Sequence, residues 1–201
     1  MDFEQIDNFL KRQIKNKTDL GSGYDEINQL LNENCLPTFH LDIEKTKNEF
    51  TNWLLTTLKR NPIPQDIVSL YFGLTTLVDN DFEKTTIYLA GSTRTPEEDE
   101  DWACETEYTP QNNYLFLSEF AKIDELKNEN IAINGEYEVL VFVGMTNLLI
   151  QNALKDTAKE LLTTKQKVLG LFKKTTQREK LYIGSGFDSG DIYLIDSITG
   201  K

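Results

Sequence analysis

The N-terminal third of the chain carries apolar residues at intervals of three and four, the spacing of a helix with one buried face. This pattern predicts three helices, over residues 3–16, over 24–34, and from a cap at Thr38 or Asp42 to the break at Pro62. Gly21 and Gly23 are expected to end the first helix, because glycine is disfavoured in a helix interior. We therefore expect a helical segment over residues 1–61.

From Ile67 onward the period changes to two, and β-branched and aromatic residues become prominent, as in half-buried strands. Residues 66–78 and 85–93 flank the turn-forming residues 79–81 and predict a β-hairpin. Alternation from Trp102 to Tyr108 predicts a third strand. Strands are therefore expected over residues 66–110.

The chain between residues 114 and 175 is expected to be mainly helical. Residues 114–127 fit a short helix or an irregular packed segment. The run VLVFV at 139–143 favours a strand, but an apolar stripe at helical spacing continues through it. We therefore expect a buried helix from Tyr137 to about Leu154. The base-rich stretch 155–180 is interpreted as the solvated face of a helix.

A final hairpin is expected over residues 180–196, where two apolar alternations are joined by Asp188, Ser189 and Gly190. The order of helices, strands, helices and strands predicts a single α+β domain, residues 1–201, in which helices pack on an antiparallel sheet. A doubly wound parallel sheet fits the pattern less well, because no βαβ unit with a GxGxxG motif is present.

Composition and charge narrow the classes of function. The 201 residues are 39% hydrophobic and 27% charged, which is ordinary for a folded domain. The formal charge is −12, so nucleic acids and anionic membranes are not expected as partners, whereas a basic protein is. No apolar run reaches the roughly 20 residues of a membrane helix, and the N-terminus lacks a secretory pattern. We expect a cytoplasmic protein, whose oligomeric state the sequence does not indicate.

Residues with catalytic or metal-binding chemistry are scarce. His40 is the only histidine, and Cys35 and Cys104 lie far apart, so no zinc site, disulfide framework or catalytic triad is indicated. Both thiols are expected to be free and mostly buried. The glycine-rich stretch 184–191 lacks the lysine of a phosphate-binding loop and is interpreted as a hairpin turn. We expect no cofactor, no metal and no catalytic residue.

The most unusual segment is 97–107, which carries seven acidic residues and no basic one. It lacks the central glycine of an EF-hand loop, so calcium binding is not favoured. One interpretation is a docking edge for a basic partner, in which the acids steer association and an exposed tryptophan supplies an apolar anchor. The other is a solvated loop with the tryptophan turned into the core. In the first interpretation the partner-binding residues are Glu97, Glu98, Asp99, Glu100, Asp101, Trp102 and Glu105.

The C-terminal sequence GFDSGDIYLIDSITGK resembles the closing hairpin of bacterial immunity-type proteins of the broad SUKH group, which neutralise toxins of polymorphic toxin systems. This resemblance implies a non-enzymatic, cytoplasmic α+β protein that binds a cognate toxin domain. The leading hypothesis is thus an acidic immunity-type protein that neutralises a basic toxin by binding it. The alternatives are a small enzyme or small-molecule-binding domain with a pocket between sheet and helices, and a scaffold protein.

Overall fold

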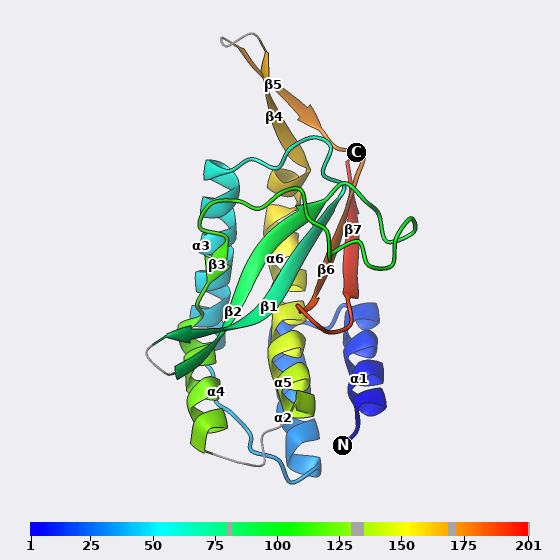
Figure 1. Cartoon of the computed structure of the whole chain (residues 1–201). Helices are drawn as coiled ribbons and strands as arrows, with labels where there is room; N and C mark the ends of the chain where they lie inside the picture. The colour runs from blue at the N-terminus through cyan, green and yellow to red at the C-terminus, as the bar shows by residue number, and fades with distance from the viewer. Residues whose placement is uncertain (80–81, 130–134, 169–171, 201) are drawn as a thin grey trace.

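The computed structural model describes residues 1–79, 82–129, 135–168 and 172–200. A five-stranded sheet lies in front of a layer of helices, and a two-stranded hairpin projects from one end (Figure 1). The predicted α+β class is confirmed.

The three predicted N-terminal helices are present as α1 (Phe3–Asn16), α2 (Leu20–Glu33) and α3 (Ile43–Arg60). Each begins after an aspartate whose carboxylate accepts a hydrogen bond from a first-turn backbone N–H, namely Asp2, Asp19 and Asp42. The cap of the third helix is therefore Asp42 and not Thr38.

The expectation that Gly21 and Gly23 end the first helix is wrong. That helix ends at Asn16, where the next residue Lys17 caps it with a left-handed backbone at φ 48°, and both glycines lie inside α2. A Cβ atom on Gly23 would lie 2.4 Å from Leu148 Cδ2. Glycine fits at position 23 because α2 and the helix that carries Leu148 approach closely there. This close packing outweighs the low helix propensity of glycine.

A long buried helix runs through the centre of the protein and confirms the helical prediction for VLVFV. It consists of α5 (Gly135–Glu138), the π-helical segment η1 (Val139–Val143) and α6 (Gly144–Leu162). By length and composition alone, the stretch Gly135–Leu162 could cross a membrane. However, 83% of its most apolar 18-residue stretch is buried inside the protein. This burial is typical of the core helix of a soluble protein.

The sheet has the order β3-β2-β1-β6-β7. Its strands are β1 (Ser69–Asp79), β2 (Phe82–Ser92), β3 (Tyr114–Leu115), β6 (Lys180–Phe187) and β7 (Tyr193–Thr199). The two predicted hairpins, β1–β2 and β6–β7, are confirmed and antiparallel. They join through a parallel pair, β1 with β6, so the sheet is mixed where we expected antiparallel pairing throughout.

Two local predictions are wrong. Residues 100–104 form turns and Tyr108 makes only an isolated bridge, to Gly91, so the third strand expected from Trp102 to Tyr108 is absent. The base-rich stretch continues α6 only to Leu162 and then forms the hairpin β4 (Thr163–Val168) and β5 (Phe172–Gln177). Threonines of both strands lie at one end of this pairing and favour strand over helix.

The remaining helix, α4 (Ser118–Glu129), is tied to α3 by a buried carboxylate. Glu119 is 1% exposed and accepts hydrogen bonds from the Asp42 backbone N–H at 3.0 Å, from Lys45 at 3.2 Å and from Lys122 at 2.6 Å. Burial by itself raises the pKa of Glu119. The three hydrogen bonds outweigh burial and lower the pKa from 4.5 to about 2.

We predict that Glu119→Gln lowers the free energy of unfolding by about 2 kcal/mol at pH 7, because it removes a charged hydrogen-bond partner from a buried site. The depressed pKa means that the carboxylate stabilises the fold fully above its ordinary pKa of 4.5 and loses this effect as the pH falls toward 2. Urea unfolding between pH 7 and pH 2.5 should therefore show a weaker acid dependence in the variant. Glu125→Gln, at an exposed position of the same helix, is the control, and an equal effect there would contradict the assignment.

Candidate functional site: the tyrosine face and the acidic segment

One face of the sheet is free of helices and carries four tyrosines, of which Tyr71, Tyr88 and Tyr114 lie side by side while Tyr182 contacts the acidic residue Glu97. Residues opposite one another in the register share a face, and the register pairs Tyr88 with Tyr114 and with Gly73, and Tyr71 with Gly184. The other face carries the apolar residues that pack against the helices in the main core. We call the helix-free side, with Tyr71, Tyr88 and Tyr114, the tyrosine face.

Glycines make room for the aromatic rings on this face. A Cβ atom on Gly73 would lie 2.1 Å from Cζ of Tyr88, and one on Gly184 would lie 2.8 Å from Cζ2 of Trp102. The rings therefore lie across backbone that has no side chain beneath them. They form a row, in which ring centroids are 6.1 Å apart from Trp102 to Tyr71, 6.1 Å from Tyr71 to Tyr88 and 6.0 Å from Tyr88 to Tyr114.

Trp102 is buried, with 2% of its surface exposed. Together with Tyr71 and Ala103 it forms a small cluster separate from the main core, and this cluster fastens the loop between β2 and β3 onto the sheet. The anchoring role that we expected for Trp102 requires an exposed ring, so that part of the docking hypothesis is wrong. The interpretation that the ring turns into the protein is confirmed.

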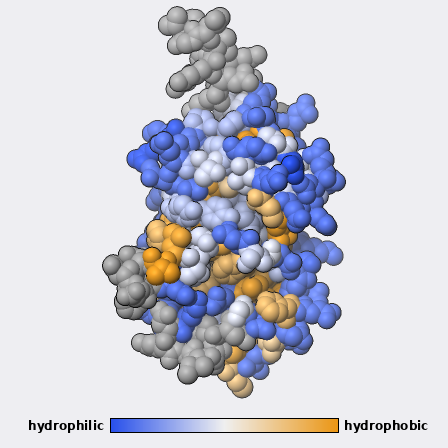
Figure 2. Space-filling view, viewed as in Figure 1, coloured by the Kyte–Doolittle hydropathy of each residue, from blue (hydrophilic) through white to orange (hydrophobic). Residues whose placement is uncertain are grey.

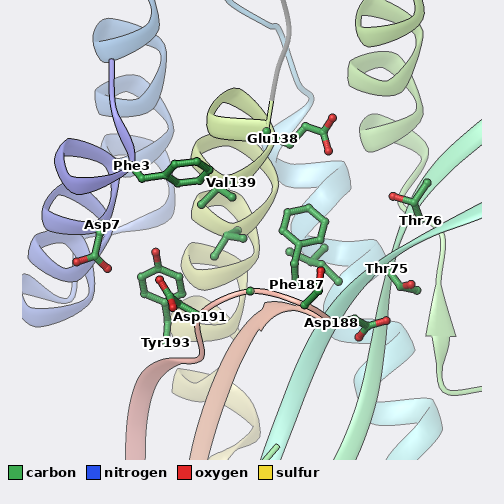
Figure 3. Close-up of a pocket in the computed structure, with 15 residues that line it drawn as sticks. Phe3, Asp7, Thr75, Thr76, Glu138, Val139, Phe187, Asp188, Asp191 and Tyr193 are labelled. Carbon is green, nitrogen blue, oxygen red and sulfur yellow. The ribbon is translucent and has the colours of Figure 1, made fainter. Parts of the chain in front are cut away.

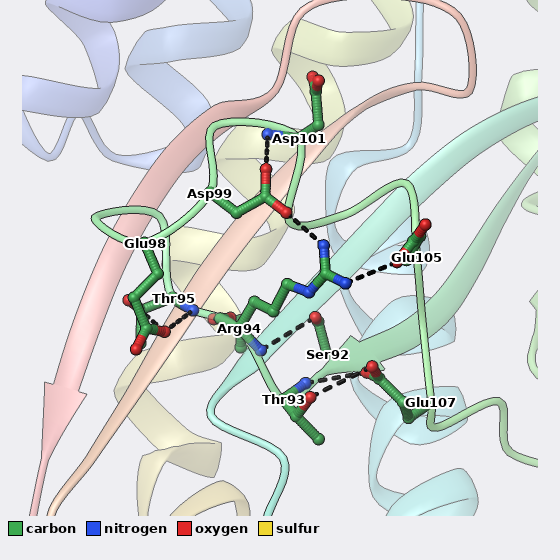
Figure 4. Close-up of polar contacts among 10 residues, drawn as sticks. Ser92, Thr93, Arg94, Thr95, Glu98, Asp99, Asp101, Glu105 and Glu107 are labelled. Carbon is green, nitrogen blue, oxygen red and sulfur yellow. Dashed lines mark hydrogen bonds and ion pairs between the residues drawn. The ribbon is translucent and has the colours of Figure 1, made fainter.

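The acidic segment, residues 97–107, is organised around Arg94 (Figure 4). The guanidinium group donates to Asp99 at 2.6 Å and to Glu105 at 2.7 Å, and the hydrogen bond from Arg94 lowers the pKa of Asp99. The backbone N–H and hydroxyl of Thr95 both donate to Glu98, at 2.9 and 3.0 Å. These contacts give the segment a defined conformation.

The expected partner-binding acids therefore fall into two groups. Asp99, Glu105 and Glu98 are engaged within the segment, and Glu97 accepts a hydrogen bond from Tyr182 at 2.7 Å. That bond lowers the pKa of Glu97. The side chains of Glu100 and Asp101 are exposed and have no ion-pair or hydrogen-bond partner in the part of the chain that the structure describes. These last two carboxylates are free to meet a partner.

A shallow pocket of about 390 Å³ lies on the tyrosine face, between the tyrosines, Cys104 and Asp188. Tyr88 donates a short hydrogen bond to Asp188, and Tyr71 donates to the backbone carbonyl of Phe187 at 3.2 Å. Burial, reinforced by the charge of Asp188, raises the pKa of both tyrosines above 10. Their hydroxyls therefore stay protonated at neutral pH and serve as hydrogen-bonding groups.

The cysteine prediction is half right. Cys35 and Cys104 are both free, but both are exposed, because each lies in a turn and not in a packed element. Sequence reasoning also missed the row of tyrosines, since Tyr71 and Tyr88 fall in two predicted strands and Tyr114 falls in a segment expected to be a short helix or irregular. The feature that identifies this face is that glycines of one strand lie opposite aromatic residues of the next. This pairing becomes visible only once the register of the strands is known.

A second pocket of about 500 Å³ opens between helices and sheet (Figure 3). It is lined by α1, by the end of β1, by the junction of α5 and η1, and by the turn 187–191 between β6 and β7. We call it the turn pocket.

Figure 2 shows the sheet side of the protein, where apolar atoms gather toward the lower half and hydrophilic atoms occupy much of the margin.

Across residues 1–79, 82–129, 135–168 and 172–200, no three His, Cys, Asp or Glu side chains are arranged to hold a metal ion. His40 is exposed, in the segment that leads into α3. Comparison with protein-family models, with curated proteins and with solved structures finds no match. The resemblance of the C-terminal hairpin to the SUKH group therefore stays a prediction.

We predict that Gly73→Ala destabilises the protein by about 2 kcal/mol and reduces the near-ultraviolet circular dichroism of its tyrosines, because the added methyl group displaces the Tyr88 ring. The measurement is urea unfolding with near-ultraviolet spectra of the folded state. Gly21→Ala is the control, since its Cβ atom meets nothing closer than 3.6 Å and alanine favours the helix. Equal stability of Gly73→Ala and the unmodified protein would contradict the proposed packing.

Proposed function

We propose that the protein is a non-enzymatic binding protein of the immunity type, which neutralises a basic toxin domain in the cytoplasm by covering it. The tyrosine face and the acidic segment are the proposed contact surface. The observation that carries the proposal is the position of Tyr114, 47% exposed on a sheet face that also carries an acidic loop with two unpaired carboxylates.

Tyrosine suits this role because a large, rigid ring contributes contact area while its hydroxyl group remains available for hydrogen bonds. The net charge of −12 attracts a basic protein at long range, and unpaired carboxylates close to the contact strengthen that attraction. The surface therefore fits a basic protein whose own contact area carries apolar or aromatic groups at its centre.

The fastened loop favours binding because little ordering is required. Trp102 holds the acidic segment on the sheet, and Arg94 fixes two of its carboxylates. A surface that is already ordered loses less conformational entropy when it binds. The same contacts mean that Asp99 and Glu105 can pair with a partner only by giving up Arg94, so we assign the main steering role to Glu100 and Asp101.

A second candidate function is small-molecule binding, which the turn pocket favours. Its volume of about 500 Å³ lies within the roughly 300–1,000 Å³ of typical ligand sites. It also lies between sheet and helices, where the alternative hypothesis expected a pocket. This function would use Phe3, Asp7 and Asp191, which do not line the pocket on the tyrosine face.

The first experiment is to capture the partner from an extract of the source cells on the immobilised protein at low salt, and to purify it for kinetic measurement. The proposal expects one basic protein whose activity is suppressed by stoichiometric complex formation. The assignment of the contact surface would be contradicted if the purified partner bound equally well to a variant that combines Glu100→Gln, Asp101→Asn and Tyr114→Ala.

For the acidic segment, we predict that Glu100→Gln combined with Asp101→Asn slows association with the partner about threefold to tenfold at low salt, with little change in dissociation. The difference should shrink at high salt, because screening removes long-range attraction. Surface plasmon resonance at two salt concentrations measures both rates. The matched control is Asp25→Asn with Glu44→Gln, which removes the same charge from exposed positions on α2 and α3.

For the tyrosine face, we predict that Tyr114→Ala speeds dissociation of the partner about tenfold or more while the association rate stays within twofold. The physical reason is the loss of a large, partly exposed ring from the contact. Leu55→Ala is the control, because Leu55 is a partly exposed apolar residue on α3, on the helical side. Dissociation rates that rise equally in both variants would argue against the tyrosine face.

A further inference from the structure

The turn pocket combines apolar walls with carboxylates. Phe3 is 56% exposed and reaches from α1 toward Val139, which is the first residue of the π-helical segment (Figure 3). Phe187 lines the pocket from the end of β6. Phe3 and Phe187 therefore give the pocket two aromatic walls.

Four carboxylates line the same pocket from three parts of the chain. Asp7 comes from α1, Glu138 from α5, and Asp188 and Asp191 from the turn between β6 and β7. Asp7 pairs with Lys11 at 2.8 Å, and Glu138 pairs with Lys127 at 3.0 Å. Both lysines lie outside the lining, and Asp188 accepts the hydrogen bond of Tyr88.

Asp191 is exposed and has no ion-pair or hydrogen-bond partner among the described side chains. No Lys, Arg or His lines the pocket in the described ranges. The pocket is therefore negative overall, despite the two neighbouring lysines.

These features exclude several ligand classes. An anion would meet four carboxylates and no cation, and a neutral apolar molecule would strip water from those carboxylates without replacing its hydrogen bonds. A metal ion requires ligands that converge, and no such group exists among the described residues. An aliphatic chain that ends in a cation satisfies both kinds of wall, since its methylene groups pack on the rings and its charge meets carboxylates and aromatic faces.

We infer that the turn pocket binds an alkylammonium group, with Asp191 as its principal charge partner and Phe3 and Phe187 as its apolar walls. This site adjoins the tyrosine face, with which it shares Phe187, Asp188 and Gly190. Its charge partner Asp191 and its wall Phe3 lie outside that face, so the inference is tested independently of the proposed function. The same chemistry is offered by a free polyamine and by a lysine side chain of a protein, and the test separates the two.

The test is a titration of the isotope-labelled full chain with spermidine, followed through the backbone amide signals of Gly135, Ser189 and Gly190 in nuclear magnetic resonance spectra. We expect saturable shifts of these signals, and at least threefold weaker binding for Asp191→Asn and for Phe3→Ala. Both residues are exposed, so neither change threatens the fold. The neutral chain 1,8-octanediol should produce no saturable shift.

The control for non-specific attraction to an acidic protein is again Asp25→Asn with Glu44→Gln. Equal weakening in that variant and in Asp191→Asn, or no saturable shift with spermidine, would overturn the inference. A parallel titration with N-acetyl-lysine methylamide identifies the source: tighter binding than spermidine points to a lysine of a protein, and weaker binding points to a free polyamine. If spermidine does not bind the turn pocket, the partner-binding measurements on Glu100, Asp101 and Tyr114 are unaffected. Each proposal can therefore be rejected without rejecting the other.

Discussion

The burial of one apolar helix on every side is the constraint on which the fold depends. Residues 140–150 are all buried, so neighbours cover nearly all of η1 and the first half of α6 all round. Helices α1, α2 and α3 cover part of this helix, and strands β6 and β7 cover the rest. Close approach is possible because Gly144 meets Ile27 and Leu10, and Gly23 meets Leu148, without an intervening Cβ atom. Since this helix draws the others to one side of the sheet, the opposite side is left for the tyrosines.

The open side is stabilised by different means. It lacks a helical layer, and in its place aromatic rings lie on strand glycines while Trp102 fastens a long loop across the sheet. Charge inside that loop is balanced locally by Arg94, which reduces the repulsion among neighbouring carboxylates. The result is a surface that is ordered and acidic, yet still presents partly exposed rings. Both proposals, the docking surface and the cation pocket, use this combination of negative charge and aromatic groups.

Sequence patterns predicted the parts of the fold whose signals are local. The helical stripes, the cap at Asp42 and the turn residues of the hairpin β6–β7 each lie within a few positions of the structure that they specify. The turn predicted at residues 79–81 lies largely outside the described residues. The parallel pairing of β1 with β6 joins segments more than a hundred residues apart, and no local pattern encodes it. The same holds for the site: the acidic segment was evident from its composition, whereas the orientation of Trp102 depends on Gly184 in a distant strand. The hairpin β4–β5 was missed because its lysines looked like the polar side of a helix.

The parallel pair also sets an order of events during synthesis of the chain. β1 lies at the middle of the sheet, but its neighbour β6 is translated last but one among the strands. Until residues 180–187 leave the ribosome, the hairpin β1–β2 has one unpaired edge whose N–H and C=O groups can pair with another chain. The central helix is likewise translated after the helices that cover it. Completion of this fold therefore waits for β6, and nascent chains are most exposed to misassociation just before the β6–β7 hairpin emerges.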